Sequence, residues 1–428
     1  MKLFPTLCSC LLAGLAASHA SEDLLERIDQ VLTVSAFHDN LRLRLSGTID
    51  LEGYFLQQPP PGLLFTQKHA LFNPRLTLFL DAQCGSRVYV FAQARLDRGF
   101  DPSDHGARLR LDEYALRLTP WEDGRFNVQV GQFATVVGNW AARHGSWENP
   151  FLTAPAPYEN LTGIWDSAAV PSLTVLRQWA HVRPFLAGEY ADKNLRNPII
   201  WGPSYTTGAS VFGRVGKFDY AAEIKNASLS SRPEDWSVNE TQWQHPTVSG
   251  RLGFRPDQMW NLGVSGSVGS YLESRAAGTL APGHKLDDYR EIVIAQDVSF
   301  AWHHLQLWAE FYETRFAIPA IGNADTFAYY VEAKYKFTPQ LFGALRWNQQ
   351  LFSTMDSLVV VPPSVIGQPP VSRLESHRWG RDLWRIDAAL GYRFTAHTQL
   401  KLQYSLQHED DGPRARTHLF GVQFTLRF

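Results

Sequence analysis

The chain has 428 residues and a formal net charge of −2, with 40 Lys and Arg against 42 Asp and Glu. This near balance argues against a nucleic-acid-binding protein, which would carry a basic excess. The mean hydropathy is −0.23, and the sequence has no apolar run of about 18 residues, which excludes a bundle of transmembrane helices. A membrane β-barrel is not excluded, because each of its strands shows only every second residue to lipid.

The N-terminus has the pattern of an export signal. Lys2 supplies a positive charge, and the apolar stretch Leu3–Ala17 is too short to span a membrane. Ser18-His19-Ala20 is a small-x-small cleavage site, so we expect a signal peptide over residues 1–20 that is cleaved after Ala20. A retained membrane anchor is the alternative, which the short apolar stretch disfavours. Cleavage would leave Cys84 as the only cysteine, so no intramolecular disulfide is expected.

Residues 21–40 differ in pattern from everything that follows. Leu24, Leu25, Ile28, Val31 and Leu32 recur at helical spacing with charged residues between them. The spacing predicts a short N-terminal amphipathic helix. We interpret it as a periplasmic tether, and a plug or an oligomerisation element is the alternative.

From Leu41 the apolar residues recur with a period of two. Leu41, Leu43 and Leu45 alternate with Arg42 and Arg44, which predicts a strand with one apolar and one polar face. The same alternation predicts about eighteen strands, each long enough to cross a membrane when tilted. They are 41–56, 70–82, 86–98, 109–119, 124–132, 172–180, 183–190, 204–213, 217–229, 243–255, 259–272, 287–301, 304–316, 325–337, 340–353, 381–394, 397–408 and 414–428. The segments 204–213 and 287–301 are weakly patterned, so sixteen strands is the fallback count.

The connections between these strands alternate between tight turns and long loops. Long loops include Asn226–Gln242 and Thr354–Gly380. The tight turns fall at Cys84-Gly85, Glu122-Asp123-Gly124, Val182-Arg183-Pro184, Arg214-Val215-Gly216, Pro256-Asp257, Trp302-His303, Thr338-Pro339 and Thr395-Ala396. Short turns on one side and long loops on the other are typical of bacterial outer-membrane barrels.

Aromatic residues gather beside the tight turns. They are Trp121, Trp179, Phe185, Phe218, Phe254, Trp260, Phe300, Trp302, Phe337, Phe342, Phe394 and Phe428. Amphipathic rings favour the membrane interface, where barrels carry girdles of them. An open sheet edge in lipid would leave backbone groups without partners, so the sheet must close. The sequence therefore predicts an all-β, antiparallel transmembrane β-barrel over residues 41–428.

The last residues of the chain, FGVQFTLRF, resemble the C-terminal strand of Gram-negative outer-membrane proteins. In that family a terminal aromatic residue is part of the signal read by the barrel assembly machinery. The resemblance implies that Phe428 contacts this machinery, and that the barrel lies in the lipid of the bacterial outer membrane.

A second resemblance concerns residues 133–171, a long connection after the fifth predicted strand. In outer-membrane porins the corresponding loop folds into the barrel and narrows the pore, which implies a constriction loop here. Trp140, Trp147 and Tyr158 give this segment apolar bulk, and such aromatic content argues against disorder. An external cap or an interface with a neighbouring subunit is the alternative.

Strand parity and the constriction loop together give a set of candidate pore-lining residues. They are Arg42, Arg44, Arg75, Arg95, Glu113, Arg117, Arg143, Glu148, Glu159, Asp166, Arg346 and Arg385. Wall arginines opposite loop carboxylates would set a transverse field that filters solutes by charge. The alternative is that these charges pair with one another and solvate a water-filled interior. The same reasoning points His144, Lys334 and Arg393 inwards.

The function that these features favour is a porin-like channel for passive diffusion of small hydrophilic solutes or ions. A non-conducting structural or adhesive barrel is the first alternative, and a barrel enzyme is the second. The sequence has no GxSxG or HExxH motif, and we expect no enzyme activity, no metal and no cofactor. The transported solute and its charge stay open, as does the choice between a monomer and a homotrimer.

Overall fold

The fold was analysed in a computed structural model, which describes residues 31–38, 40–97, 108–180, 195–232, 243, 245–361, 371–410 and 416–428. One antiparallel sheet contains seventeen strands, and one of them, β1, lies outside the ring, so sixteen strands form the barrel. The barrel strands are β2 (Leu41–Leu56), β3 (Ala70–Cys84), β4 (Val88–Asp97), β5 (Arg108–Leu118), β6 (Asn127–Phe133), β7 (Thr206–Val215), β8 (Phe218–Lys225), β9 (Thr247–Phe254), β10 (Trp260–Ser270), β11 (Arg290–Trp302), β12 (Leu305–Ile318), β13 (Gly322–Lys336), β14 (Leu341–Phe352), β17 (Leu383–Arg393), β18 (Thr398–Glu409) and β19 (Thr417–Arg427).

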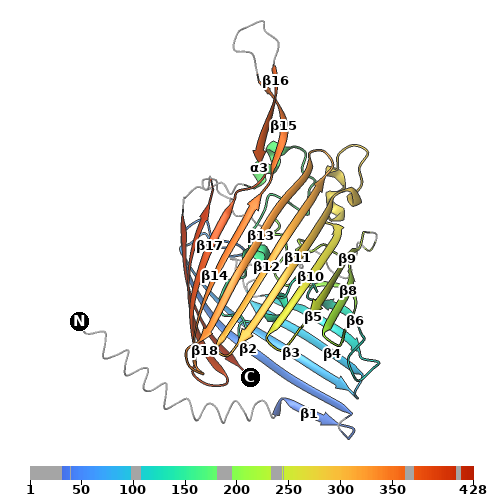
Figure 1. Cartoon of the computed structure of the whole chain (residues 1–428), viewed down its shortest axis with the longest axis vertical. Coiled ribbons are helices and arrows are strands. Elements are labelled where there is room, and N and C mark those ends of the chain that lie inside the picture. Colours follow the sequence, from blue (N-terminus) through green and yellow to red (C-terminus); the bar gives the residue numbers. More distant parts are fainter. Residues whose placement is uncertain are drawn as a thin grey trace, which may run out of the picture.

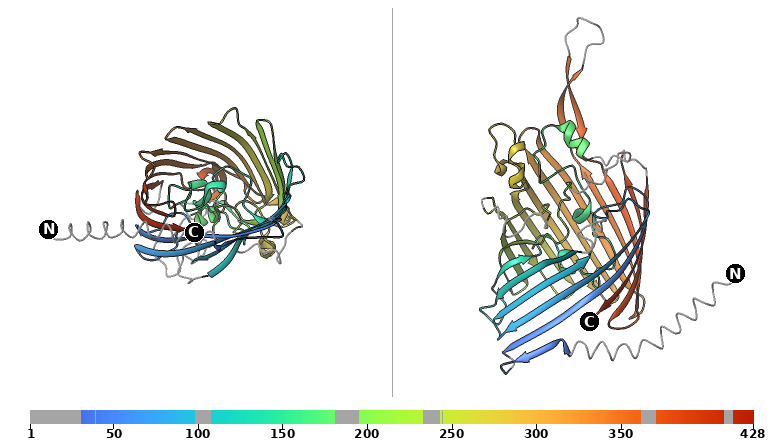
Figure 2. Two further views of the ribbon diagram at one scale, coloured as in Figure 1. Left: turned by 90° about the horizontal axis from the view of Figure 1, so that it is seen from below. Right: turned by 180° about the vertical axis from the view of Figure 1, so that it is seen from behind.

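The ring closes where the last strand meets the first. β19 pairs antiparallel with β2 in a register that sets Phe424 opposite Leu51. Each remaining barrel strand pairs with its neighbour in sequence, except that β14 pairs with β17 across an insertion. Closure satisfies the backbone groups that an open edge would expose to lipid. Figure 1 shows the strands tilted around the barrel, and Figure 2 shows the ring from below.

The expected count of about eighteen barrel strands is wrong, and the ring has sixteen. The weakly patterned segments 204–213 and 287–301, which motivated the fallback count, both form strands, β7 and β11. Sixteen of the predicted segments correspond to barrel strands. The prediction of a strand over 172–180 is wrong, because Leu173–Trp179 forms the helix α3. The Ser172 hydroxyl accepts a hydrogen bond from the Val175 amide at 3.3 Å, and buried Leu173 and Leu176 fit one helical face. The predicted strand 183–190 lies outside the described residues.

A short strand replaces the end of the predicted N-terminal helix. Residues Thr33–Ala36 form β1, which pairs with Leu41–Arg44 of β2, so the helical prediction is wrong there. β2 extends beyond the end of β19, and β1 takes up the backbone edge that this extension leaves. Figure 1 shows β1 at the lower rim, beside the turns. Residues 21–30 and the signal peptide lie outside the described part of the chain.

The two faces of the barrel wall carry opposite kinds of side chain. On β14, Leu345 is 61% exposed on the outer face, whereas Arg346 and Asn348 are buried on the inner face. The same parity on β2 exposes Leu51 and buries Asp50 and Glu52. The predicted alternation is confirmed, and it gives a barrel that is apolar outside and polar inside.

The connections also follow the prediction. Seven of the eight predicted tight turns join adjacent barrel strands, and the eighth, Val182-Arg183-Pro184, lies outside the described residues. Large rings are exposed beside these turns at Trp121, Phe218, Trp302 and Phe337, which is the expected girdle. Trp179 differs because it lies in α3, while Phe342 differs because it is buried.

The loop between β14 and β17 carries its own hairpin. β15 (Thr354–Val361) and β16 (Val371–Arg378) pair only with each other and rise beyond the barrel on the side of the long loops (Figure 1). Within the described ranges, no helix is long and apolar enough to cross a membrane.

Candidate functional site

The first part of the connection between β6 and β7, up to residue 171, lies inside the barrel. We name residues 134–171 the inner segment; it contains the short helices η1 (Ala141–Arg143) and α2 (Ala156–Glu159). The left view of Figure 2 shows this green part of the chain within the ring of strands. Its aromatic side chains explain the location, because Phe151 and Tyr158 are almost completely buried against the inner wall.

The first fixed point of the inner segment is Glu310 on β12. Its carboxylate accepts hydrogen bonds from the Asn139 amide at 2.8 Å and from the Tyr158 and Tyr312 hydroxyls at 2.6 and 2.5 Å. Gly138 makes this approach feasible, since it has φ +74° and an added Cβ would lie 2.2 Å from the Tyr312 hydroxyl. Burial raises the pKa of Tyr158 well above its usual value, so this hydroxyl stays protonated and donates.

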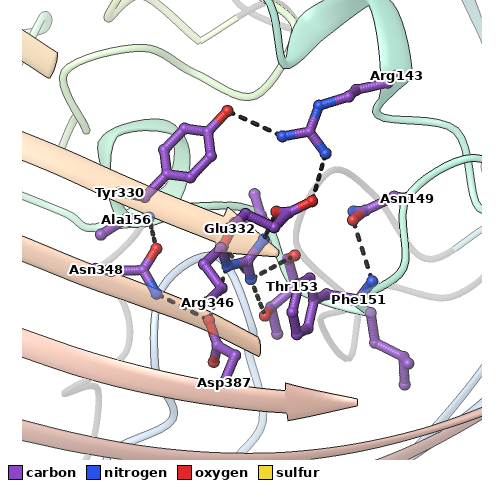
Figure 3. Close-up of polar contacts among 12 residues, drawn as sticks. Arg143, Asn149, Phe151, Thr153, Ala156, Tyr330, Glu332, Arg346, Asn348 and Asp387 are labelled. Atoms are coloured by element: carbon purple, nitrogen blue, oxygen red, sulfur yellow. Dashed lines mark hydrogen bonds and ion pairs between the residues drawn. The ribbon is translucent and has the colours of Figure 1, made fainter. Parts of the chain in front are cut away.

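The second fixed point joins Arg143 to β12 and β13. Its guanidinium donates to Glu332 at 2.6 Å and to the Tyr330 hydroxyl at 3.0 Å, and it lies 4.3 Å from the centre of the Trp308 ring. Figure 3 shows Arg143 reaching down from η1 to these two wall residues. A charge-assisted pair at this distance holds the helix against the wall.

The third fixed point is Arg346 on β14, which is fully buried. Arg346 donates to Asp387 on β17 at 2.9 Å and to the carbonyls of Thr153 and Ala154 at 3.0 and 3.1 Å (Figure 3). Arg385, also on β17, donates to the Ala154 carbonyl at 2.6 Å and forms an ion pair with Glu159. These arginines therefore satisfy backbone oxygens of the inner segment that would otherwise be buried without partners.

A fourth set of contacts comes from β18. The Lys401 ammonium donates to the carbonyls of Ser146 and Asn149 at 2.7 and 2.9 Å. The Gln403 side chain accepts the Leu152 amide at 2.5 Å. Gly138 and Asn139 also donate to Ser265 on β10 and Ser299 on β11. The inner segment is thus attached to the barrel strands from β10 to β18, and at its start to β5 and β8.

On the opposite side, two cavities lie between the inner segment and β2, β3 and β4, beside a contact of Leu152 with the cluster of Tyr54 and Leu71. The larger cavity has a volume of about 780 Å³ and reaches the turn end of the barrel, where Arg427 and Phe428 line it. The smaller cavity has a volume of about 150 Å³ and extends toward Glu159. Both cavities are lined by Arg75, Arg95, His144 and Ser146, which we name the junction.

The arginines of the junction are held by carboxylates of the wall. Arg75 contacts Asp50 at 3.2 Å and Glu52 at 2.5 Å, while Arg95 contacts Asp97 at 3.2 Å and Asp112 at 3.1 Å. Arg110 also contacts Asp97 at 3.3 Å and Asp112 at 3.4 Å, so three arginines face four carboxylates here. These pairs fix the side chains that border the two cavities.

His144 of the junction is held in one neutral tautomer. Its Nδ1 lies 2.6 Å from the Ala141 carbonyl and must donate there, so Nε2 accepts from the Tyr205 hydroxyl at 2.6 Å. Burial lowers the pKa of His144 to about 4, and Arg95 acts in the same direction against the Ala141 hydrogen bond. His144 is therefore uncharged at neutral pH.

The predicted site residues fall into three groups. Arg44, Arg75, Arg95, Glu113 and Glu148 line the larger cavity. Arg143, Glu159, Arg346 and Arg385 hold the inner segment against the wall, and Glu159 also lines the smaller cavity.

The third group lies away from both cavities. Arg42 is exposed where β2 extends beyond β19 and pairs with β1. Arg117 donates to Gln129 at 2.9 Å beneath aromatic rings, and buried Asp166 accepts the Glu273 amide through its backbone carbonyl.

Sequence reasoning missed several residues of the site. Lys401 and Arg427 follow the inward parity of their strands, so the alternation itself could have identified them. Ser146 carries no comparable signal, because its role depends on where the inner segment lies. Glu310 was expected to face inwards from strand parity, and the structure has it there, but parity could not show its contact with the inner segment. Within the described residues, no group of three or more His, Cys, Asp and Glu is arranged to hold a metal ion.

Comparison with known proteins gives a fold but no family. No family model and no curated protein matches the sequence. Among solved structures, the outer-membrane channel DcaP of Acinetobacter baumannii has a TM-score of 0.54 at 11% identity, covering 92% of this chain and 100% of that chain. Salmonella typhi OmpF in complex with daunomycin has a TM-score of 0.53 at 11% identity, with coverage of 92% and 100%.

A third structure is the anion-selective porin from Comamonas acidovorans, with a TM-score of 0.51, 11% identity and coverage of 91% and 100%. The chain has the barrel fold of outer-membrane porins, and likeness at this identity assigns it to no subfamily.

Proposed function

We propose that this protein is an outer-membrane channel through which small hydrophilic solutes or ions diffuse passively. The observation that carries this proposal is the pair of neighbouring cavities that share the residues of the junction in their linings, between the inner segment and the wall of β2–β4. In this account the inner segment is the constriction loop, and the junction is the narrowest part of the path.

The chemistry of the lining supports a path for water-soluble compounds. Charged and polar side chains from both the wall and the inner segment border the larger cavity, including Arg44, Arg75, Glu113 and Glu148. Such groups replace part of the hydration shell of a polar solute, so the energetic cost of entering the channel is small. A barrel plugged by a packed apolar core would offer no such lining.

The transverse field is proposed at the junction rather than along the whole loop. Arg385 and Glu159 are in direct contact, as are Arg143 and Glu332, so these pairs act as attachments. Arg75 and Arg95 border the opening itself, and their carboxylate partners lie on the same wall. The field that a solute meets is therefore set by these two arginines and by the residues of the inner segment that face them.

The outer-membrane location follows from the apolar outer wall together with the expected signal peptide. The DcaP structure is itself described as an outer-membrane channel. Assembly through Phe428, a homotrimer and the absence of enzyme activity stay predictions of the same proposal.

The test is electrical. The chain from Ser21 onward is refolded, its folding is checked by heat-modifiable gel migration, and it is inserted into a planar lipid bilayer. We expect discrete single-channel steps in potassium chloride. A barrel that folds and never conducts would contradict the proposal and would favour a non-conducting structural or adhesive barrel.

A further inference from the structure

Five basic side chains lie on the inner face at the turn end of the barrel. We name Arg44 on β2, Lys334 and Lys336 on β13, Arg393 on β17 and Arg427 on β19 the basic arc. Each occupies a strand position whose side chain faces the inside of the barrel, whereas neighbouring residues such as Tyr392 and Leu426 face outwards. Arg44 and Arg427 line the larger cavity, so part of the arc borders the proposed solute path.

Most members of the arc are not neutralised by a neighbouring carboxylate. Within the described residues, no ion pair involves Lys334, Lys336, Arg393 or Arg427. Elsewhere at the same rim two arginines are paired, Arg125 with Asp123 at 3.0 Å and Arg255 with Asp219 at 3.0 Å. Basic side chains without an ion pair are thus concentrated on the part of the rim that the arc forms.

Arg427 lines the larger cavity and is held by two contacts. Its Nε donates to the Ala396 carbonyl at 2.8 Å, and its guanidinium carbon lies 4.2 Å from the centre of the Trp147 ring. Arg393 is placed similarly, with Nε on Gln399 at 3.0 Å and its guanidinium carbon 5.0 Å from the same ring. A guanidinium fixed through Nε and stacked on an aromatic ring presents its remaining N–H groups in a defined direction.

Three acidic side chains line the same cavity as Arg44 and Arg427, namely Asp50, Glu113 and Glu148. Asp50 is in contact with Arg75 at 3.2 Å, and Glu113 accepts the Ala134 amide at 2.9 Å. Glu148 of the inner segment is exposed, lines the same cavity and acts electrostatically on both Arg393 and Arg427. Glu332 is already in contact with Arg143 and Arg346. The five basic side chains of the arc therefore outnumber the three acidic side chains that line this cavity.

From these observations we infer that the turn-side mouth attracts anionic solutes and binds their carboxylate or phosphate groups at Arg427. The planar fork of a guanidinium matches both groups, which accept two parallel hydrogen bonds. The rest of the basic arc adds a long-range attraction that raises the local concentration of anions. This inference rests on the proposed channel function, because it names the class of solute that the path favours.

The experiment compares Arg427→Gln with Arg214→Gln. Arg214 is a matched control, since it is exposed at the turn end of β7, donates through Nε to the Gly216 carbonyl at 3.1 Å and lines neither cavity. Reversal potential is measured across a potassium chloride gradient. Block of the current is measured with inorganic pyrophosphate and, separately, with citrate, added to each side in turn.

We expect the native channel and Arg214→Gln to prefer chloride over potassium and to be blocked by both anions from the turn side. Arg427→Gln should reduce the permeability ratio at least about twofold and raise the half-blocking concentration about tenfold, as expected for losing one charged hydrogen-bond partner. Block by only one of the two anions would identify which of the two groups the site accepts. If Arg427→Gln and Arg214→Gln have the same reversal potential and the same half-blocking concentrations, the anion site is overturned and the channel proposal is left intact.

Equilibrium dialysis of labelled pyrophosphate against the folded barrel separates the two proposals. If no variant conducts, binding that is retained in Arg214→Gln and lost in Arg427→Gln would support the site while the channel proposal fails. No binding to the native barrel would overturn the site.

Discussion

At the scale of single residues, His144 is the group whose charge is most sensitive to its surroundings. It borders both cavities and is fixed between the Ala141 carbonyl and the Tyr205 hydroxyl. A proton on Nε2 would turn an acceptor into a donor, and the Tyr205 hydroxyl would then have to accept. Protonation would also place a positive charge beside Arg95.

We therefore predict an acid-sensitive inner segment. The pKa of His144 is lowered to about 4 in the folded protein, below its usual value of 6.5, chiefly by burial. The unfolded segment binds the proton first, so stability is lost as the pH falls from about 6.5 to about 4 and changes little further below. His144→Gln cannot be protonated in this range and should flatten the profile.

The measurement is the rate of hydrogen exchange in the inner segment at several pH values, corrected for the intrinsic pH dependence of exchange. The difference between the native protein and His144→Gln isolates the histidine from carboxylates that titrate in the same range. Equal profiles would show that His144 is not the sensitive group.

The sequence indicated which side chains face inwards but not what they contact there. Strand parity placed Arg75, Arg95 and Arg346 on the inner face, and the structure has them there. Parity could not show that Arg346 is used by the backbone of Thr153, because that partner is 193 residues away in sequence. Such a contact depends on the path of a loop, which has no repeating pattern.

At the scale of elements, the inner segment is positioned by buried polar contacts as much as by apolar packing. Arg346 and Arg385 supply charged donors to Ala154, and Glu310 accepts three donors near Tyr158. Breaking a buried ion pair by removing one partner costs about 3–5 kcal/mol, because the other charge stays buried. The stability of the segment therefore depends on a few wall residues.

We predict that Arg346→Gln loosens the inner segment without opening the barrel. The substitution leaves Asp387 and the Thr153 and Ala154 carbonyls short of donors, so amides of residues 151–159 should exchange at least about tenfold faster. Arg251→Gln is the control, because Arg251 bridges Asp219 and Asp297 on the wall without a bond to the inner segment. Equal exchange in the two variants would contradict this role of Arg346.

Elements were predictable where a pattern repeats. The strands were found from alternation over many residues, and the turns from their composition. Segment 172–180 was misread because a short apolar run fits both periods, and only the cap at Ser172 favours the helix. β1 was misread because its pairing depends on how far β2 extends beyond β19, which is a tertiary feature.

At the scale of the whole molecule, the barrel is defined by the difference between its two faces. The outer wall exposes large apolar residues along the strands, which is stable only in contact with lipid. The closure of the sheet, the aromatic girdle and the alternation of apolar and polar residues were all predictable, because every strand that crosses lipid must pair its backbone groups and present apolar side chains outwards. The solute path was not predictable, because it depends on how the inner segment folds inside the barrel.

We predict that a charge on the outer wall destabilises the barrel only at membrane depth. Leu345→Arg, at a residue 61% exposed on β14, should cost about 2–4 kcal/mol of unfolding free energy in lipid vesicles. Leu374→Arg is matched in exposure at 63%, but β16 rises beyond the barrel, so its cost should be near zero. Chemical denaturation measures both, and equal costs would show that the outer wall does not face lipid.

The most direct test of the central claim concerns Ser146, which borders both cavities. Ser146→Cys is made with Cys84→Ser and exposed to a charged thiol reagent while single-channel current is recorded. Labelling should reduce the current by at least about half, because the added group occupies the junction. The chain with native Cys84, which is exposed at the end of β3, should be labelled without a change in current. If Cys at position 146 is labelled and the current is unchanged, solutes do not pass through the junction, and the account of the path is contradicted.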